Sequence, residues 1–134
     1  MKIKTDFVTN SSSTSFVVMT KGELTLHSFL KAVGVSQESM FLGLFVKLFN
    51  LFKNDMNRLE YTAIRYGCSN VEEYIEQYFS KDTQARIRQA RENGFEIYVG
   101  ELRSDNDEIE TLFCCDAFVI EGDKLIIDAT ENEW

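Results

Sequence analysis

Hydrophobic residues in this chain recur at two different spacings, and this constrains the fold more than any other feature of the sequence. Between Gly22 and Asn93 they recur every three to four residues, which is the spacing of one face of a helix. Before and after that stretch they alternate or form short β-prone runs, as strands do. The sequence therefore predicts an α+β domain, in which an antiparallel or mixed sheet packs against helices.

Two strands are expected towards the N-terminus and about three towards the C-terminus: residues 3–8, 16–19, 96–102, 118–121 and 124–128. The polar residues between the first two strands, 9–15, should form a turn. Gly122-Asp123 is a two-residue loop of the kind that closes a hairpin, so the last two strands are expected to pair with each other.

About four helices are expected in the middle of the chain. The first ends at Gly34. The second begins near Ser36, whose hydroxyl can cap the first turn, and it continues or resumes as far as Tyr66. A third helix follows a cap at Ser69 or Asn70.

The fourth expected helix, residues 82–93, is mostly polar. It should therefore be exposed, and its apolar contacts are limited to Ala85, Ile87 and Ala90. A short helix is also possible between the C-terminal strands, over residues 105–115, with apolar residues facing inward.

The chain has the size of one domain. Its 134 residues contain no proline, no repeat and no Gly/Ser linker, so residues 1–134 are expected to form a single domain. The N-terminal segment lacks the apolar stretch of a secretory signal. Cys68, Cys114 and Cys115 are an odd number of cysteines, and two are adjacent, so we expect free thiols and a cytoplasmic protein.

The longest apolar run, residues 40–52, extends from Met40 to Phe52. It is shorter than the roughly 20 residues that a membrane-spanning helix needs, so no membrane is expected as a partner. As a helix it would be apolar on nearly all sides. Such a helix either lies in the core of one domain or is shared with a second copy of the chain in a homodimer.

The acidic charge of the chain lies in its C-terminal part. Residues 96–134 carry two basic and twelve acidic side chains, a balance of −10, whereas residues 1–95 balance at +2. Such a surface repels phosphate backbones, which argues against duplex nucleic acid as a direct partner, and it attracts a basic protein surface. The densest acidic cluster is expected at the solvated start of a helix and consists of Asp105, Asp107, Glu108 and Glu110.

A polar tract near the N-terminus is the most unusual local feature. It consists of Asn10, Ser11, Ser12, Ser13 and Thr14. These residue types suit a hairpin turn, because their side chains hydrogen-bond to the nearby backbone. They also suit a docking or modification site, and in a tight turn their backbone amides can converge on an anion.

Two arginines on the fourth expected helix offer a further anion site. Arg88 and Arg91 are three residues apart and therefore share a helical face, which could bind a phosphate-bearing ligand. The alternative is a charged helix face that serves solubility.

No set of residues in the sequence indicates catalysis, a cofactor or a metal. The one histidine, His27, lies among apolar neighbours on an expected helix, which is more typical of a structural histidine than of a general base. The cysteines lack the spacing of a zinc site, and the acidic cluster lacks the central glycine and the final glutamate of a calcium-binding loop. We therefore expect no cofactor, and the sequence favours a binding protein over an enzyme.

The first eighteen residues, MKIKTDFVTNSSSTSFVV, resemble the start of a group of small uncharacterised proteins from Firmicutes and their phages, with the pattern M-K-I-x-x-x-F-V-[ST]-N-S-S-S-x-S-F. Thr9 and Thr14 stand where serine is commoner in that group, and both keep the hydroxyl. Some members are also similar to a strand and an acidic segment like residues 96–110. The resemblance implies an accessory gene of a phage or mobile element, and it implies no particular activity.

Three functions are left open. The charge asymmetry favours a non-catalytic binding protein, such as a phage-encoded inhibitor of a host defence or regulatory factor, whose acidic C-terminal region engages a basic protein surface. The second is a small-molecule or nucleotide-binding protein that uses the polar tract with Arg88 and Arg91. The third is a scaffold that presents the polar tract to a modifying enzyme.

Overall fold

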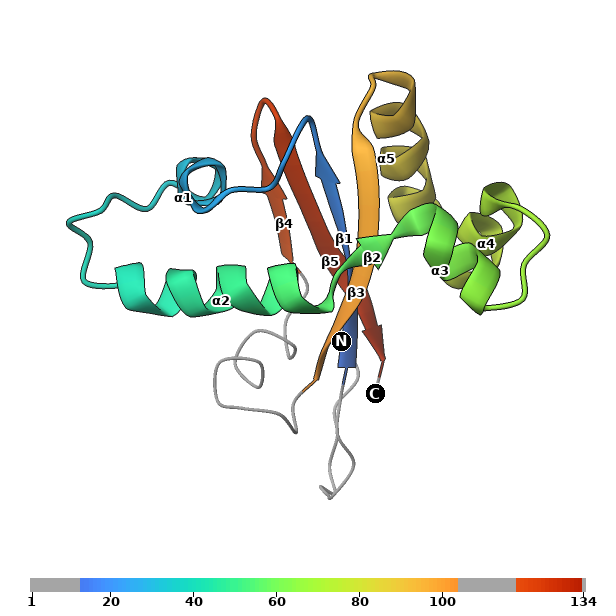
Figure 1. Ribbon diagram of the computed structural model, residues 1–134, viewed down its shortest axis with the longest axis horizontal. Helices are drawn as coiled ribbons and strands as arrows, with labels where there is room; N and C mark the ends of the chain where they lie inside the picture. Colours follow the sequence, from blue (N-terminus) through green and yellow to red (C-terminus); the bar gives the residue numbers. More distant parts are fainter. Residues whose placement is uncertain (1–12, 104–117, 134) are drawn as a thin grey trace.

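The computed structural model describes residues 13–103 and 118–133, and it confirms the α+β class. Five strands and five helices lie within those residues (Figure 1). The strands are β1 (Ser13–Thr20), β2 (Asn57–Arg58), β3 (Glu96–Arg103), β4 (Phe118–Glu121) and β5 (Leu125–Glu133). The helices are α1 (Leu26–Val33), α2 (Leu42–Asp55), α3 (Leu59–Arg65), α4 (Val71–Tyr78) and α5 (Lys81–Glu92).

These strands form one antiparallel sheet in the order β2-β3-β1-β5-β4. Helices α1 and α2 cover what we call the first face of the sheet, and α3, α4 and α5 cover the second face (Figure 1). The domain therefore has three layers, with the sheet in the middle and a separate hydrophobic core on each of its faces.

The central strand β1 is apolar on both faces because it lies between the two helical layers. Phe16 and Val18 pack in the core of the first face, and Val17 and Met19 pack in the core of the second. Successive side chains of a strand point to opposite faces, so a strand covered on both sides needs a continuous apolar run. The Phe16 ring meets the Phe52 ring of α2 edge-on, with 4.7 Å between centroids.

Helix α2 begins at Leu42, so the predicted start near Ser36 is wrong. Two successive turns occupy the intervening residues, because the N–H of Ser39 donates to the Ser36 carbonyl (3.1 Å) and the N–H of Leu42 donates to the Ser39 carbonyl (3.2 Å). Met40 and Phe41 consequently precede the helix, and they are 87% and 57% exposed.

The long helical pattern is interrupted and then resumes, which is one of the two alternatives left by the sequence. Helix α2 ends at Asp55, and Asn57 and Arg58 pair with β3 as the short strand β2. Helix α3 follows at once and ends before Gly67. The φ angle of Gly67 is 77°, a left-handed conformation that glycine adopts easily and that a right-handed helix does not contain. At β2 the chain crosses from the first face of the sheet to the second.

The polar turn predicted over residues 9–15 is wrong for its last three residues, because Ser13, Thr14 and Ser15 belong to β1. Their backbones pair with β3 on one side and with β5 on the other. The backbone N–H and C=O groups therefore bond to these strands, whereas in a turn nearby side chains would bond to them. The predicted strand over residues 3–8 and the short helix over residues 105–115 lie outside the described residues.

Helices α4 and α5 and the C-terminal hairpin are confirmed. The Asn70 side chain caps α4 by accepting from the N–H of Glu73 (2.8 Å). In α5, Ile87 and Ala90 are buried as predicted, but Ala85 is exposed, because the buried face continues through Thr83. The N–H of Gly122 donates to the Leu125 carbonyl (2.7 Å), so the hairpin loop lies one residue later than predicted.

Candidate functional site

The two unusual segments of the sequence meet the sheet at one end, which we call the polar end. Strand β1 begins there at Ser13, β3 ends at Arg103, β4 begins at Phe118 and β5 ends at Glu133. Ser13 is paired with Arg103 on one side and with Glu133 on the other. Residues 104–117, which contain the acidic cluster, therefore connect two strands at the same end at which the polar tract enters β1.

The predicted site residues themselves are only partly described. Ser13 and Thr14 of the polar tract lie at the start of β1. Its other members, Asn10, Ser11 and Ser12, lie outside the described residues. So does the whole acidic cluster: Asp105, Asp107, Glu108 and Glu110.

Of the six strand residues paired with Ser13, Thr14 and Ser15, three are acidic and one, Arg103, is basic. Ser15 of β1 is paired with Glu101 of β3 and with Glu131 of β5. Glu133 of β5 stands opposite Ser13. The polar tract thus enters the sheet between two strands whose register positions at this end carry carboxylate residues.

Arg88 and Arg91 of α5 share a face, as predicted, and both contact Glu72 of α4. Arg88 forms an ion pair with the carboxylate at 3.1 Å, and Arg91 forms one at 3.7 Å. All three side chains are partly exposed, where a single ion pair adds at most about 1 kcal/mol. In this arrangement the two arginines join α4 to α5 and share one carboxylate.

A pocket of about 290 Å³ lies near the polar end, between the second face of the sheet and helices α3 and α4. No local pattern in the sequence indicated this pocket, because its residues come from distant parts of the chain. We call it the tyrosine pocket, and its walls are formed by side chains or backbone of Ser15, Asp55, Asn57, Thr62, Arg65, Tyr66, Tyr74, Phe79, Val99, Gly100 and Glu101.

Gly100 allows the elements around this pocket to approach one another. A Cβ atom at this position would lie 2.5 Å from the Phe16 ring and 2.6 Å from the carbonyl oxygen of Asp55. The last turn of α2 therefore packs directly on the β3 backbone, and this brings Asp55 to the pocket. A glycine inside a strand is the signal in the sequence that indicates such a close approach.

The aromatic wall of the pocket is a cluster of rings on α3 and α4. The Tyr74 ring lies 5.4 Å from that of Tyr66, 5.0 Å from that of Tyr78 and 5.6 Å from that of Phe79, measured between centroids. Tyr74 is 5% exposed, whereas Tyr66 and Tyr78 are about half exposed. The cluster therefore extends from the buried interior of the pocket to the surface.

Burial raises the pKa of the Tyr74 phenol well above its ordinary value, and the neighbouring phenols of Tyr66 and Tyr78 and the Glu101 carboxylate add to the effect. The phenolic oxygen belongs to a side chain that lines the pocket, as Glu101 also does. Within the described residues, this oxygen has no hydrogen-bond partner.

The charged residues that line the pocket are Asp55, Glu101 and Arg65, and the Asp55 atom beside Gly100 is its backbone carbonyl oxygen. Asp55 comes from the end of α2, and Glu101 comes from β3. The guanidinium carbon of Arg65 lies 5.8 Å from the centroid of the Tyr61 ring, on the exposed side of α3. The chain's single histidine, His27, lies in α1 on the other face of the sheet. The pocket thus offers acceptor oxygens and aromatic faces for binding.

A second polar group that sequence analysis missed is Asp128 of β5, which is fully buried against α5. Arg86 Nη1 and the Thr83 hydroxyl donate to its Oδ2 at 2.8 and 3.1 Å. The N–H and the hydroxyl of Thr130 donate to its Oδ1 at 3.1 and 2.7 Å. Both carboxylate oxygens are hydrogen-bonded, so the burial of this charged group is compensated. Its role is structural, because it joins the sheet to α5.

Within the residues that the structure describes, no group of three or more His, Cys, Asp or Glu side chains is placed to hold a metal ion. In the same residues, no helix is both long enough and apolar enough to cross a membrane. Cys68, the cysteine that the structure describes, is a free thiol, as predicted. Comparison of the chain with protein-family models, with curated proteins and with solved structures gives no match.

Proposed function

We propose that this protein is a non-catalytic binding protein that engages a basic surface of a partner protein through its acidic C-terminal region. A cytoplasmic inhibitor of a host factor, encoded by a phage or mobile element, is the kind of protein that this describes. In this proposal the main contact to the basic surface is made by the acidic cluster of Asp105, Asp107, Glu108 and Glu110.

The observation that supports this proposal is the arrangement at the polar end. Both ends of the acidic segment, residues 104–117, are anchored there, at Arg103 and Phe118. The polar tract enters the sheet beside them at Ser13. Two acidic residues that line the tyrosine pocket, Asp55 and Glu101, lie near the same end. The acidic segment and these pocket residues thus meet the sheet at one end, whereas Glu96, Glu121 and Asp123 lie at its other end.

Concentrated charge of one sign attracts a partner of the opposite sign over a distance of about 10 Å at moderate salt. It raises the association rate more than it raises the affinity, and salt weakens its effect. A binding protein that works in this way should therefore lose its partner at high ionic strength, which a protein that binds by apolar contacts does not.

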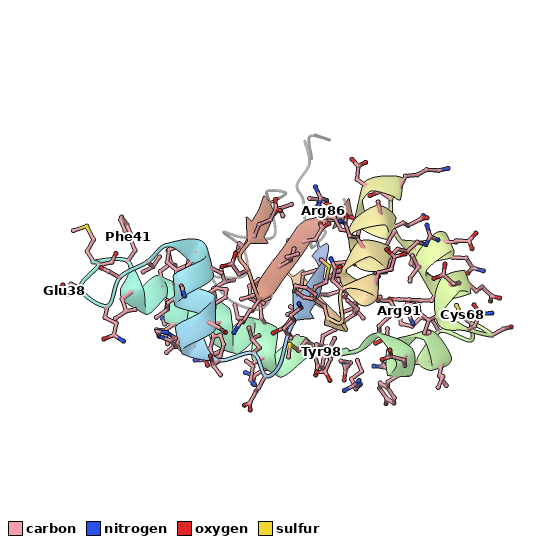
Figure 2. The ribbon with its side chains drawn as sticks, turned by 90° about the horizontal axis from the view of Figure 1, so that it is seen from above. Glu38, Phe41, Cys68, Arg86, Arg91 and Tyr98 are labelled. Carbon is pink, nitrogen blue, oxygen red and sulfur yellow. The ribbon has the colours of Figure 1, made fainter. Side chains whose placement is uncertain are left out.

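The experiment is a pull-down from a Firmicutes lysate with the tagged protein, at low and at high salt, with three forms of the bait. They are the wild type, the double variant Asp107→Lys and Glu110→Lys, and the control Glu23→Lys and Glu38→Lys. The control makes the same change in net charge at exposed residues on the α1 and α2 side of the molecule, where Figure 2 shows Glu38 at the far end.

We expect a basic protein to be captured at low salt by the wild type and by the control, and not by the Asp107/Glu110 variant. High salt should release it from both. Equal capture by the two variants would contradict the proposal, because it would show that the position of the acidic charge does not matter.

We do not extend the proposal to a phosphate ligand on Arg88 and Arg91. Both guanidinium groups already contact Glu72, and an anion at the same place would be repelled by that carboxylate.

We also propose that the N-terminal end of α2 forms a homodimer contact. Leu48, Phe49 and Phe52 of this helix are buried in the core of the first face. Met40 and Phe41, which precede the helix, are among the most exposed apolar residues described. Figure 2 shows Phe41 at the extreme end of the molecule, away from the sheet. The apolar run thus packs against the core from Leu42 onward, and the exposed Met40 and Phe41 offer a contact to a second copy.

A further inference from the structure

We infer that the tyrosine pocket receives one cationic side chain, the ammonium group of a lysine or the guanidinium group of an arginine, from the basic surface of the partner. This inference rests on the proposed function and deepens it, because it names the chemical group that the pocket takes. It is carried by the size of the pocket, by its charge and by its aromatic wall.

The pocket has the size of one side chain. Its volume of about 290 Å³ lies at the lower limit of the roughly 300–1,000 Å³ that is typical of small-molecule sites. That volume accommodates the end of a lysine or arginine side chain. Tyr66 lines the pocket and is also exposed at the surface, so a side chain that projects from a docked partner can reach it.

The charge of the pocket suits a cation. Asp55 and Glu101 lie in its walls, and its one basic residue, Arg65, places its guanidinium group over the Tyr61 ring on the outer side of α3. Two other pockets of the described residues balance the acidic Glu121 and Asp123 with two basic residues, Lys31 and Lys124 in one and Lys21 and Arg86 in the other. A cation is therefore better accommodated in the tyrosine pocket than in either of those.

The aromatic wall adds a second kind of attraction. The faces of tyrosine and phenylalanine rings attract cations within about 6 Å of the ring centre. Tyr66, Tyr74 and Phe79 supply three such rings from α3 and from the end of α4.

The hydroxyl of Tyr74 points to the same conclusion independently. Its side chain is almost completely buried, it lines the pocket, and within the described residues its oxygen has no hydrogen-bond partner. A buried hydroxyl without a partner is costly in a folded protein, so such a group calls for an explanation. An ammonium or guanidinium group in the pocket would donate a hydrogen bond to this oxygen.

The test is a titration of the full chain, labelled with ¹⁵N, with Nα-acetyl-arginine amide and with Nα-acetyl-lysine amide. The uncharged Nα-acetyl-glutamine amide and inorganic phosphate serve as further probes. We expect the two cationic probes to shift the backbone amide signals of Thr62, Tyr66 and Gly100. The glutamine probe and phosphate should leave those signals in place.

Two variants and a control test whether the residues of the pocket contribute to binding of the probes and of the partner. Glu101→Gln removes one carboxylate, and Tyr74→Phe removes only the unpartnered hydroxyl. Each should weaken binding of the cationic probes about three- to tenfold. Glu92→Gln makes the same charge change as Glu101→Gln at an exposed residue of α5 outside the pocket, and it should have no effect. The same variants should weaken capture of the partner in the pull-down.

The outcomes separate this inference from the proposed function. If the cationic probes leave the pocket signals unchanged while Asp107→Lys with Glu110→Lys still abolishes capture, the inference is overturned and the proposed function stands. If the probes bind but Glu101→Gln and Tyr74→Phe leave partner capture unchanged, the pocket takes a free amine, and the assignment to a partner side chain is overturned. A response to phosphate in place of the cations would overturn the inference on its charge.

Discussion

At the scale of single residues, Gly100 decides how closely α2 can approach β3. The space that a Cβ atom would need at this position is occupied by the Phe16 ring and by the carbonyl oxygen of Asp55. Both neighbours belong to the core or to the backbone, and neither can move aside as the end of a flexible side chain would. The tyrosine pocket depends on this approach, because Asp55 forms part of its wall.

The substitution Gly100→Ala should therefore destabilise the protein, by about 1–3 kcal/mol as for other overpacked cores. Gly43→Ala is the matched control, since it adds the same methyl group within α2, where nothing lies within 4 Å. The control should raise the stability or leave it unchanged, because alanine favours a helix by up to about 1 kcal/mol over glycine. Urea denaturation of the two variants checks this, and equal effects would refute the packing role of Gly100.

Tyr74 should make the free energy of unfolding fall as the pH rises through the alkaline range. Because its pKa is raised in the folded state, the unfolded phenol, with its ordinary pKa near 10, ionises first. Between that pH and the higher pKa of the folded state, the folded protein binds more protons than the unfolded one. This contribution to the free energy of unfolding is complete below about pH 10 and falls by up to about 1.4 kcal/mol per pH unit above it.

Tyr74→Phe should remove this part of the pH dependence, so its free energy of unfolding should fall less steeply above pH 10 than that of the wild type. Tyr61→Phe, at an exposed tyrosine of α3, is the control and should keep the steeper slope. Urea denaturation over a series of alkaline pH values measures both. Parallel curves for wild type and Tyr74→Phe would show that burial of this phenol does not govern the slope.

At the scale of elements, α2 does two things at once. Its C-terminal half lies in the core of the first face, where Leu48 and Phe52 are fully buried. Its N-terminal end is preceded by the exposed Met40 and Phe41. These two exposed apolar residues, which stand before a helix whose Leu42 and Phe45 already pack against the core, are the feature from which we propose a homodimer.

Replacing Met40 and Phe41 by lysine should convert the homodimer to a monomer, which sedimentation equilibrium would detect as a halved mass. The control is the double variant Tyr61→Lys and Ile64→Lys, which removes an exposed apolar pair from α3 and should leave the mass unchanged. A wild-type protein that sediments as a monomer at all concentrations would rule out the dimer.

The elements also show where local sequence signals succeed. Gly34 ends α1, Asn70 caps α4 and the C-terminal hairpin forms, because each depends on the conformational preference of one or two residues. The predicted cap at Ser36 fails because the neighbouring Ser39 forms a competing turn. Ser13 to Ser15 join β1 because two neighbouring strands pair with them, and those strands begin more than eighty residues later.

At the scale of the whole molecule, the α+β class follows from the hydrophobic spacing, but the tyrosine pocket could not be predicted. Its wall combines Asp55 of α2, Tyr74 of α4 and Glu101 of β3, which only the tertiary structure brings together. Gly100, within a strand, was a visible sign of close backbone approach. The concentration of acidic charge was visible in the sequence, and the strand order adds that the acidic segment and the polar tract meet the sheet at one end.

The proposed binding to a basic partner depends on where the acidic charge lies. The most direct test is the association rate constant with the captured partner, measured at several salt concentrations for the wild type, for Asp107→Lys with Glu110→Lys, and for Glu23→Lys with Glu38→Lys. We predict a steep fall with salt for the wild type, and a rate at low salt that is lower by about tenfold or more in the Asp107/Glu110 variant than in the control. Equal rates in the two variants, or a rate that does not change with salt, would contradict the proposed function.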